Sequence, residues 1–174
     1  MTGDLAVVTG AARGMGAAVA RRLAVGGWSL LLVDACAPQP PLDYPMPTPA
    51  DLDAVARACR DAGAQTVGTL IADVGDGAVR GKIAAALGGR VPKAAVAVAG
   101  VIHGHNAWSA PDDAFDLLLR VNLYGVRKVS PSGVLGDPAG ASAGEGTRLL
   151  DQLVADLTET LDSLLADLSG SPVS

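Results

Sequence analysis

A glycine-rich turn lies near the start of the chain, where residues 9–16 read Thr-Gly-Ala-Ala-Arg-Gly-Met-Gly. Gly10 permits a tight turn, Gly14 lets a phosphate approach the backbone, and Gly16 allows a helix to pack closely on a strand. The free N–H groups of such a helix start would hold a pyrophosphate. Asp34 follows 18 residues after Gly16, where a carboxylate accepts hydrogen bonds from a ribose diol and repels a 2′-phosphate. These residues predict an NAD site, and the alternative is a turn that binds nothing.

The elements that must position this turn follow from hydrophobic periodicity. Residues 5–8 and 29–33 are continuous apolar runs, typical of parallel strands buried on both faces, and residues 17–24 between them have helical spacing. A Pro-rich loop over 36–49 follows, and Thr48 is a good N-cap for the next helix. Further helices are predicted over 49–62, 76–87 and 109–129, and further strands over 66–71 and 94–98, the last also buried. This alternation predicts an α/β fold with a parallel sheet.

Composition narrows the class of protein. The chain has 174 residues, which suits one domain with a real core, and its longest apolar stretches, 23–33 and 94–102, are shorter than the roughly 20 residues of a membrane span. No basic region precedes the first apolar run, which argues against a signal peptide. A net charge of −5 argues against nucleic-acid binding. We therefore expect a cytoplasmic protein that binds neither nucleic acid nor membrane.

The Thr-Gly-x-x-x-Gly-x-Gly spacing resembles that of the short-chain dehydrogenase/reductase family. Asp73 and Val74 are similar to the family's acid-hydrophobe pair that holds the adenine ring, and residues 98–100 resemble its Asn-Ala-Gly motif, with Val98 in place of Asn. Asn122 resembles the helix Asn that helps to position a catalytic Lys through a water, and is our one catalytic candidate. The resemblance implies a Rossmann-type three-layer fold, truncated, with strand order 3-2-1-4 and flanking helices. It implies these cofactor-binding residues: Gly10, Arg13, Gly14, Met15, Gly16, Asp34, Asp73, Val74, Ala99 and Gly100.

The loop after Asp34 resembles that of one branch of this family. Residues 34–37, Tyr44-Pro45 and residues 48–52 are similar to the insertion of the mycofactocin-coupled branch of that family. In that branch the nicotinamide cofactor is held without ready exchange, and an external redox peptide cofactor recycles it. The resemblance covers about residues 3–129 and implies alcohols and their carbonyl counterparts as substrates, with a mycofactocin-type redox partner.

Hydride transfer in this family requires a Ser, a Tyr and a Lys beyond the fourth helix, and this chain has no Tyr and no Lys after Lys128. Tyr124 and Lys128 have the Tyr-x-x-x-Lys spacing but lie inside the segment that matches the helix-Asn motif. We interpret that spacing as a chance match. The sequence therefore predicts an NAD-binding oxidoreductase-like protein with impaired catalysis.

Two histidines follow the fourth predicted strand, at His103 and His105. A proton relay is conceivable there, but a metal site would need a third ligand, so we interpret both as polar loop residues and predict no metal. Trp108 either covers the cofactor cleft or plugs a helix end. The two cysteines, Cys36 and Cys59, are too few for a disulfide framework and are expected to be a loop thiol and a small buried hydrophobe.

The last 45 residues depart from the family pattern. Residues 1–129 are expected to form the NAD-binding domain, 130–146 a flexible linker, and 147–170 a C-terminal amphipathic helix with a leucine-rich stripe. The stripe could dock on the sheet flank or pair with a second copy as a homo-oligomer. The alternative function is therefore a non-catalytic interaction module. A frameshifted or internally deleted gene is a third interpretation.

Overall fold

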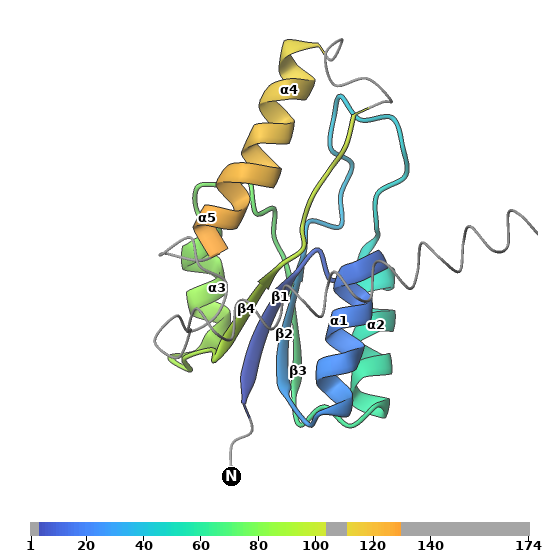
Figure 1. Cartoon of the computed structure of the whole chain (residues 1–174), viewed down its shortest axis with the longest axis vertical. Helices are drawn as coiled ribbons and strands as arrows, with labels where there is room; N and C mark the ends of the chain where they lie inside the picture. Colours follow the sequence, from blue (N-terminus) through green and yellow to red (C-terminus); the bar gives the residue numbers. More distant parts are fainter. Residues whose placement is uncertain (1–3, 104–110, 130–174) are drawn as a thin grey trace, which may run out of the picture. The chain divides into compact units, whose positions relative to one another are not determined.

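The computed structural model describes residues 4–103 and 111–129 (Figure 1). Its four strands form one parallel sheet in the order β3-β2-β1-β4, which confirms the predicted fold class and strand order. The strands are β1 (Leu5–Thr9), β2 (Ser29–Asp34), β3 (Val67–Ile71) and β4 (Ala94–Ala97). Because every crossover returns the chain to the same end, the carboxyl ends of all four strands meet at one edge of the sheet.

Helices cover both faces of this sheet (Figure 1). The first face carries α1 (Gly14–Val25) and α2 (Pro49–Asp61). The second carries α3 (Val79–Leu87) and a longer helix made of α4 (Asp112–Leu118), the π-helical turn η2 (Leu119–Gly125) and α5 (Val126–Val129). None of the helices in the described ranges is long and apolar enough to cross a membrane.

The core divides along the two faces of β1 and β2. Alternate side chains such as Val8 and Leu32 pack with α1 and α2, whereas Val7 and Val33 pack with α3. All residues of β1 and β2 are buried, as the continuous apolar runs predicted. The expectation that residues 94–98 form an equally buried strand is wrong, because β4 pairs only with β1 in the described part of the chain and its side chains are half-buried.

Local hydrogen bonds explain where α2 and α3 begin. Thr48 forms the expected cap of α2: its Oγ1 accepts from the Asp51 backbone N–H at 3.3 Å, and an Asp51 carboxylate oxygen accepts from the Thr48 N–H at 2.7 Å. The third helix begins at Val79 rather than at 76, because the Asp76 side chain accepts from the Ala78 N–H at 2.9 Å and holds a turn there. Ser109, the first residue of the helix predicted over 109–129, lies outside the described residues, as do the predicted linker and C-terminal helix.

Candidate functional site

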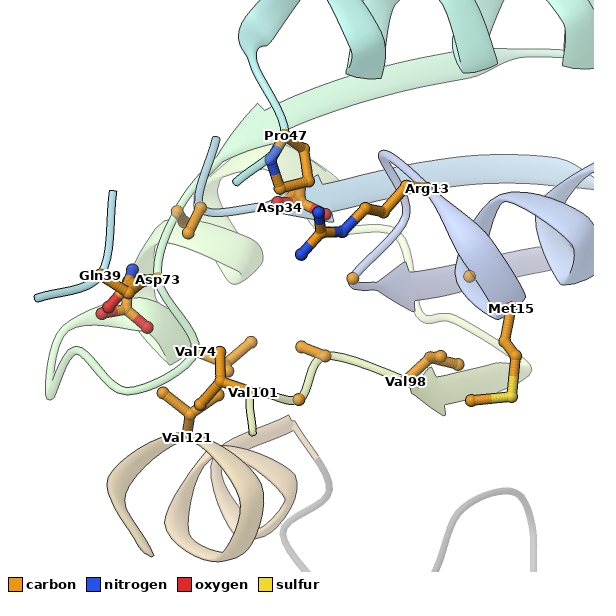
Figure 2. A pocket seen from close by; sticks show the side chains of 16 residues that line it. Arg13, Met15, Asp34, Gln39, Pro47, Asp73, Val74, Val98, Val101 and Val121 are labelled. Carbon is orange, nitrogen blue, oxygen red and sulfur yellow. The ribbon is translucent and has the colours of Figure 1, made fainter. Parts of the chain in front are cut away.

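A cavity of about 260 Å³ opens at the carboxyl ends of the strands, where ligands bind in open parallel sheets (Figure 2). Its walls are the turn after β1, the end of β2, and the segments that follow β3 and β4. The structure brings nine of the ten predicted cofactor-binding residues to its lining: Gly10, Arg13, Met15, Gly16, Asp34, Asp73, Val74, Ala99 and Gly100. The tenth, Gly14, lies in the same turn at the first residue of α1.

The glycines of this turn are required by space and by backbone conformation. Gly10 has a φ of +67°, and a Cβ there would lie 2.7 Å from both the Cα and the N of Ala99. A Cβ on Gly16 would overlap the carbonyl oxygen of Gly10. Gly14 has a φ of +55° and no atom within 4 Å of the position of a Cβ. Neighbouring protein atoms therefore leave no room for a side chain at Gly10 or Gly16, whereas the space beside Gly14 is empty.

The N-terminus of α1 has no side-chain cap among the described residues. Arg13 occupies the N-cap position without a side-chain hydrogen bond to the helix, and the first turn contains no acid. α2 has a complete capping box, whereas α3 and α4 lack a side-chain cap as α1 does. Free N–H groups and the positive pole of a helix form an anion site. The arrangement suits a phosphate group beside Gly14.

Asp34 lies at the end of β2 with its carboxylate fixed in place. One carboxylate oxygen accepts from the Ala12 backbone N–H at 3.0 Å, and the other accepts from the Cys36 backbone N–H at 3.1 Å. The residue is buried and still lines the cavity. The Cys36 thiol also donates to Oδ1, at a Sγ–O distance of 3.9 Å, whereas Oδ2 keeps a further lone pair. Asp34 can therefore still accept a hydrogen bond from a ribose hydroxyl.

The neighbouring thiol responds to the Asp34 charge. Burial, followed by the negative charge of Asp34, raises the pKa of Cys36 to about 11. Burial also raises the pKa of Cys59, which packs in the core against α1. Both thiols therefore remain protonated at neutral pH, as expected for a loop thiol and a small buried hydrophobe.

Asp73 is held by a residue that sequence reasoning missed. Its carboxylate accepts from the Gly75 N–H at 2.7 Å and forms an ion pair at 2.7 Å with Arg120 on η2. Arg120 also donates to the Oε1 of Gln39 at 3.2 Å, and Gln39 lines the cavity from the Pro-rich loop. No local signal could identify this contact, because 47 and 81 residues separate Arg120 from its two partners.

The segment after β4 is fixed by Asn122. Its Oδ1 accepts from the Val101 N–H and its Nδ2 donates to the Val101 carbonyl oxygen, both at 2.8 Å. The Ala99 N–H donates to the Thr9 hydroxyl at 3.4 Å. Val98 lines the same end of the cavity as Met15, at the position where the resembled family has Asn (Figure 2). Asn122 thus supports the cavity wall through the backbone, apart from any role in catalysis.

The Pro-rich loop lines part of the cavity and is bonded to two of the segments beside it. The Ile102 N–H donates to the Tyr44 hydroxyl at 3.1 Å, which ties the loop to the segment after β4. Arg13 donates to the Pro45 carbonyl oxygen at 2.7 Å, and its guanidinium lies 5.9 Å from the centre of the Tyr44 ring. These contacts join the glycine-rich turn, the loop and the segment after β4 around one opening.

Tyr124 and Lys128 stand apart from this cavity. The Lys128 ammonium donates to the Gly75 carbonyl oxygen at 2.6 Å, and the Tyr124 ring is half exposed. Both line a second cavity, of about 280 Å³, and neither lines the first.

The remaining polar candidates are described only in part. His103 is half-buried, whereas His105 and Trp108 lie outside the described residues. In the ranges 4–103 and 111–129, no group of three or more His, Cys, Asp or Glu side chains is placed to hold a metal ion.

Comparison with known proteins points to one group. No family model matches the sequence. An uncharacterized oxidoreductase of Mycobacterium tuberculosis is 35% identical over 131 residues, which are 72% of this chain and 45% of the relative. An uncharacterized NAD-dependent oxidoreductase of the same species is 33% identical over 147 residues, 83% of this chain and 52% of the relative. The chain therefore spans about half the length of these curated relatives.

The solved structures that are similar to this chain include dehydrogenases. Carveol dehydrogenase from Mycobacterium avium, in complex with NAD, is 32% identical with a TM-score of 0.68, over 76% of this chain and 49% of that protein. A short-chain dehydrogenase from Mycobacterium paratuberculosis, bound to NAD, is 28% identical with a TM-score of 0.66, over 75% and 49%. The relatives and structural neighbours are thus short-chain dehydrogenases and oxidoreductases, and the chain has their Rossmann-type fold over about half their length.

Proposed function

We propose that this chain binds NAD as the cofactor-binding part of a short-chain dehydrogenase. The observation that carries the proposal is that the fixed Asp34 carboxylate and the uncapped N-terminus of α1 border one cavity. Two NAD-bound neighbours and an NAD-dependent relative support it. Titration of the full chain with NADH, followed by nicotinamide fluorescence, tests the proposal. A saturable increase is expected, and its absence at millimolar NADH would contradict it.

The residues present fit a dinucleotide. The first N–H groups of α1 would hold the pyrophosphate beside Gly14, and Asp34 would accept from the hydroxyls of the adenosine ribose. Asp73 and Val74 would face the adenine, since both line the same cavity. A fixed carboxylate at Asp34 repels a 2′-phosphate and favours NAD over NADP. When bound, the cofactor supplies hydride acceptance or donation.

We propose further that the chain by itself does not catalyse hydride transfer. Residues 129–174 contain no Tyr and no Lys, and the Tyr124–Lys128 pair lines a different cavity from the proposed cofactor. Incubation with NAD and a panel of alcohols should give no NADH absorbance. Turnover that disappears in Tyr124→Phe would overturn this part of the proposal and leave NAD binding standing.

We infer that the loop retains the cofactor, as the resemblance to the mycofactocin-coupled branch implies. The contacts of Arg13 and Tyr44 join the loop to the glycine-rich turn and to the segment after β4, so we infer that release of a ligand requires them to break. Purified protein should release NAD on denaturation, and exchange with labelled NAD should be slow in the native state. Tyr44→Phe removes the hydroxyl that joins the loop to Ile102 and should speed exchange. Equal exchange rates would contradict retention by the loop.

A second candidate function is an interaction module. Phe115 and Leu123 are more than half exposed on the long helix, spaced so that they share one side of it with Leu119. Exposed apolar side chains in a row favour a protein partner or a second copy. Sizing the full chain and Leu123→Glu by light scattering tests this function. A monomer in both cases removes its support.

A further inference from the structure

The second cavity is lined almost entirely by positive charge. Four of its five lining residues are cationic, and they come from two elements: Arg80 from α3, and Arg120, Arg127 and Lys128 from the long helix. The fifth, Tyr124, adds a half-exposed ring and a hydroxyl. In Figure 1 the start of α3 lies beside α5, on the face of the sheet opposite α1 and α2. The cavity is therefore separate from the proposed dinucleotide site.

Three of the four cations already have protein partners. Arg80 donates to the carbonyl oxygens of Lys128 at 3.3 Å and Arg127 at 3.4 Å, which satisfies the end of the helix. Lys128 donates to the Gly75 carbonyl oxygen, and Arg120 pairs with Asp73. Carbonyl groups satisfy hydrogen bonds without cancelling a full charge. These contacts fix the side chains in place while leaving most of their charge uncompensated.

The carboxylates near the second cavity do not neutralise all of its positive charge. Asp73 neutralises Arg120, and Asp76 forms its ion pair with Lys82 at 2.7 Å. A backbone hydrogen bond is the main cause of the lowered pKa of Asp76, and the positive charge of Lys128 is only a minor one. Among the described residues, neither the Arg127 guanidinium nor the Tyr124 hydroxyl has a hydrogen-bond partner. At least two positive charges and several N–H and O–H donors thus remain available to a ligand.

We propose that this cavity binds the phosphate group of a small phosphomonoester. A phosphate dianion matches two uncompensated cations, and guanidinium groups present paired N–H donors that fit its oxygens. The volume of about 280 Å³ leaves room for an organic group beside the phosphate, and the Tyr124 ring offers an apolar face for it. Arg80 and Arg127 approach from different elements and provide the donors, while Arg120 also remains bonded to Asp73.

Amide chemical shifts of the ¹⁵N-labelled full chain test the proposal. Inorganic phosphate should shift the Arg80, Tyr124 and Arg127 amides in a saturable manner, phenyl phosphate should bind more tightly, and benzoate at equal ionic strength should leave them unchanged. Arg127→Gln should weaken phenyl phosphate binding about fivefold, the size of one exposed charge-assisted contact, and should leave NAD binding unchanged. Arg57→Gln, an exposed arginine on α2, is the matched control and should bind as the wild type does.

Several results would overturn the proposal. Shifts confined to the turn at Gly10–Gly16 would place the phosphate in the dinucleotide cavity. Equal affinity in the double variant Arg80→Gln/Arg127→Gln would show that phosphate binds elsewhere, and equal losses in Arg127→Gln and Arg57→Gln would reduce the effect to net charge. Linear shifts without saturation would also contradict a built site. Because NAD binding is measured on the same samples, failure here is distinguishable from failure of the proposed function.

Discussion

Replacing Gly10 by Ala tests how tightly β1 and β4 approach at the cavity floor. Gly10 and Gly14 have positive φ values of +67° and +55°, so an Ala at either position should lose about 1–2 kcal/mol through the left-handed backbone. The two positions differ in the room for a side chain. A Cβ at Gly10 would lie 2.7 Å from the Ala99 backbone, whereas a Cβ at Gly14 would have no atom within 4 Å. Overpacking of this kind costs about 1–3 kcal/mol more.

The expected loss of unfolding free energy is therefore about 2–5 kcal/mol for Gly10→Ala and about 1–2 kcal/mol for Gly14→Ala. Urea denaturation followed by circular dichroism measures both. Gly81→Ala is the control, because this glycine lies inside α3 with open space and an ordinary φ, and the change should stabilise the protein by about 0.5–1 kcal/mol. Equal losses at Gly10 and Gly14 would refute the close approach of the two strand ends.

Three further predictions concern single contacts. Thr48→Ala removes the cap of α2 and should lower the unfolding free energy by about 1 kcal/mol, measured in urea; no change would contradict the capping box. Cys36 should react slowly with iodoacetamide at pH 8 and faster as the pH approaches its pKa of about 11, because the thiolate is the nucleophile. Asp34→Asn removes a negative charge that raises that pKa, so it should speed the reaction at fixed pH, and an unchanged rate would argue against the influence of Asp34. Asn122→Ala leaves both polar groups of the Val101 backbone without their partner and should cost about 1 kcal/mol, read by the same urea titration.

Features with local causes could be predicted from the sequence. The Thr48 cap depends on residues three positions apart, and the glycine-rich turn depends on the strand and helix directly beside it. The continuous apolar runs predicted burial of β1 and β2 because those strands lie inside the sheet. The same reasoning failed at β4, since periodicity does not reveal which strand has a neighbour on one side only.

Features that depend on distant residues could not be predicted. The Arg120–Asp73 ion pair forms only once the long helix packs beside the segment after β3. Arg13 was expected at the cofactor, and it lines that cavity, but its bond to the Pro45 carbonyl depends on the path of a loop without periodicity. The cluster of cations around Arg80 arises where α3 meets the end of the long helix, and Arg80 is 47 and 48 residues from its two partners there.

Calorimetric titration of the full chain with NAD and with NADP tests the central proposal most directly. Asp34 is fixed at the cavity by the Ala12 and Cys36 N–H groups, so NAD should bind more tightly than NADP. Asp34→Asn should weaken NAD binding about tenfold, as expected for the loss of one charge-assisted hydrogen bond, and should narrow the difference between the cofactors. No heat of binding with NAD, or an unchanged preference in Asp34→Asn, would contradict the proposed site.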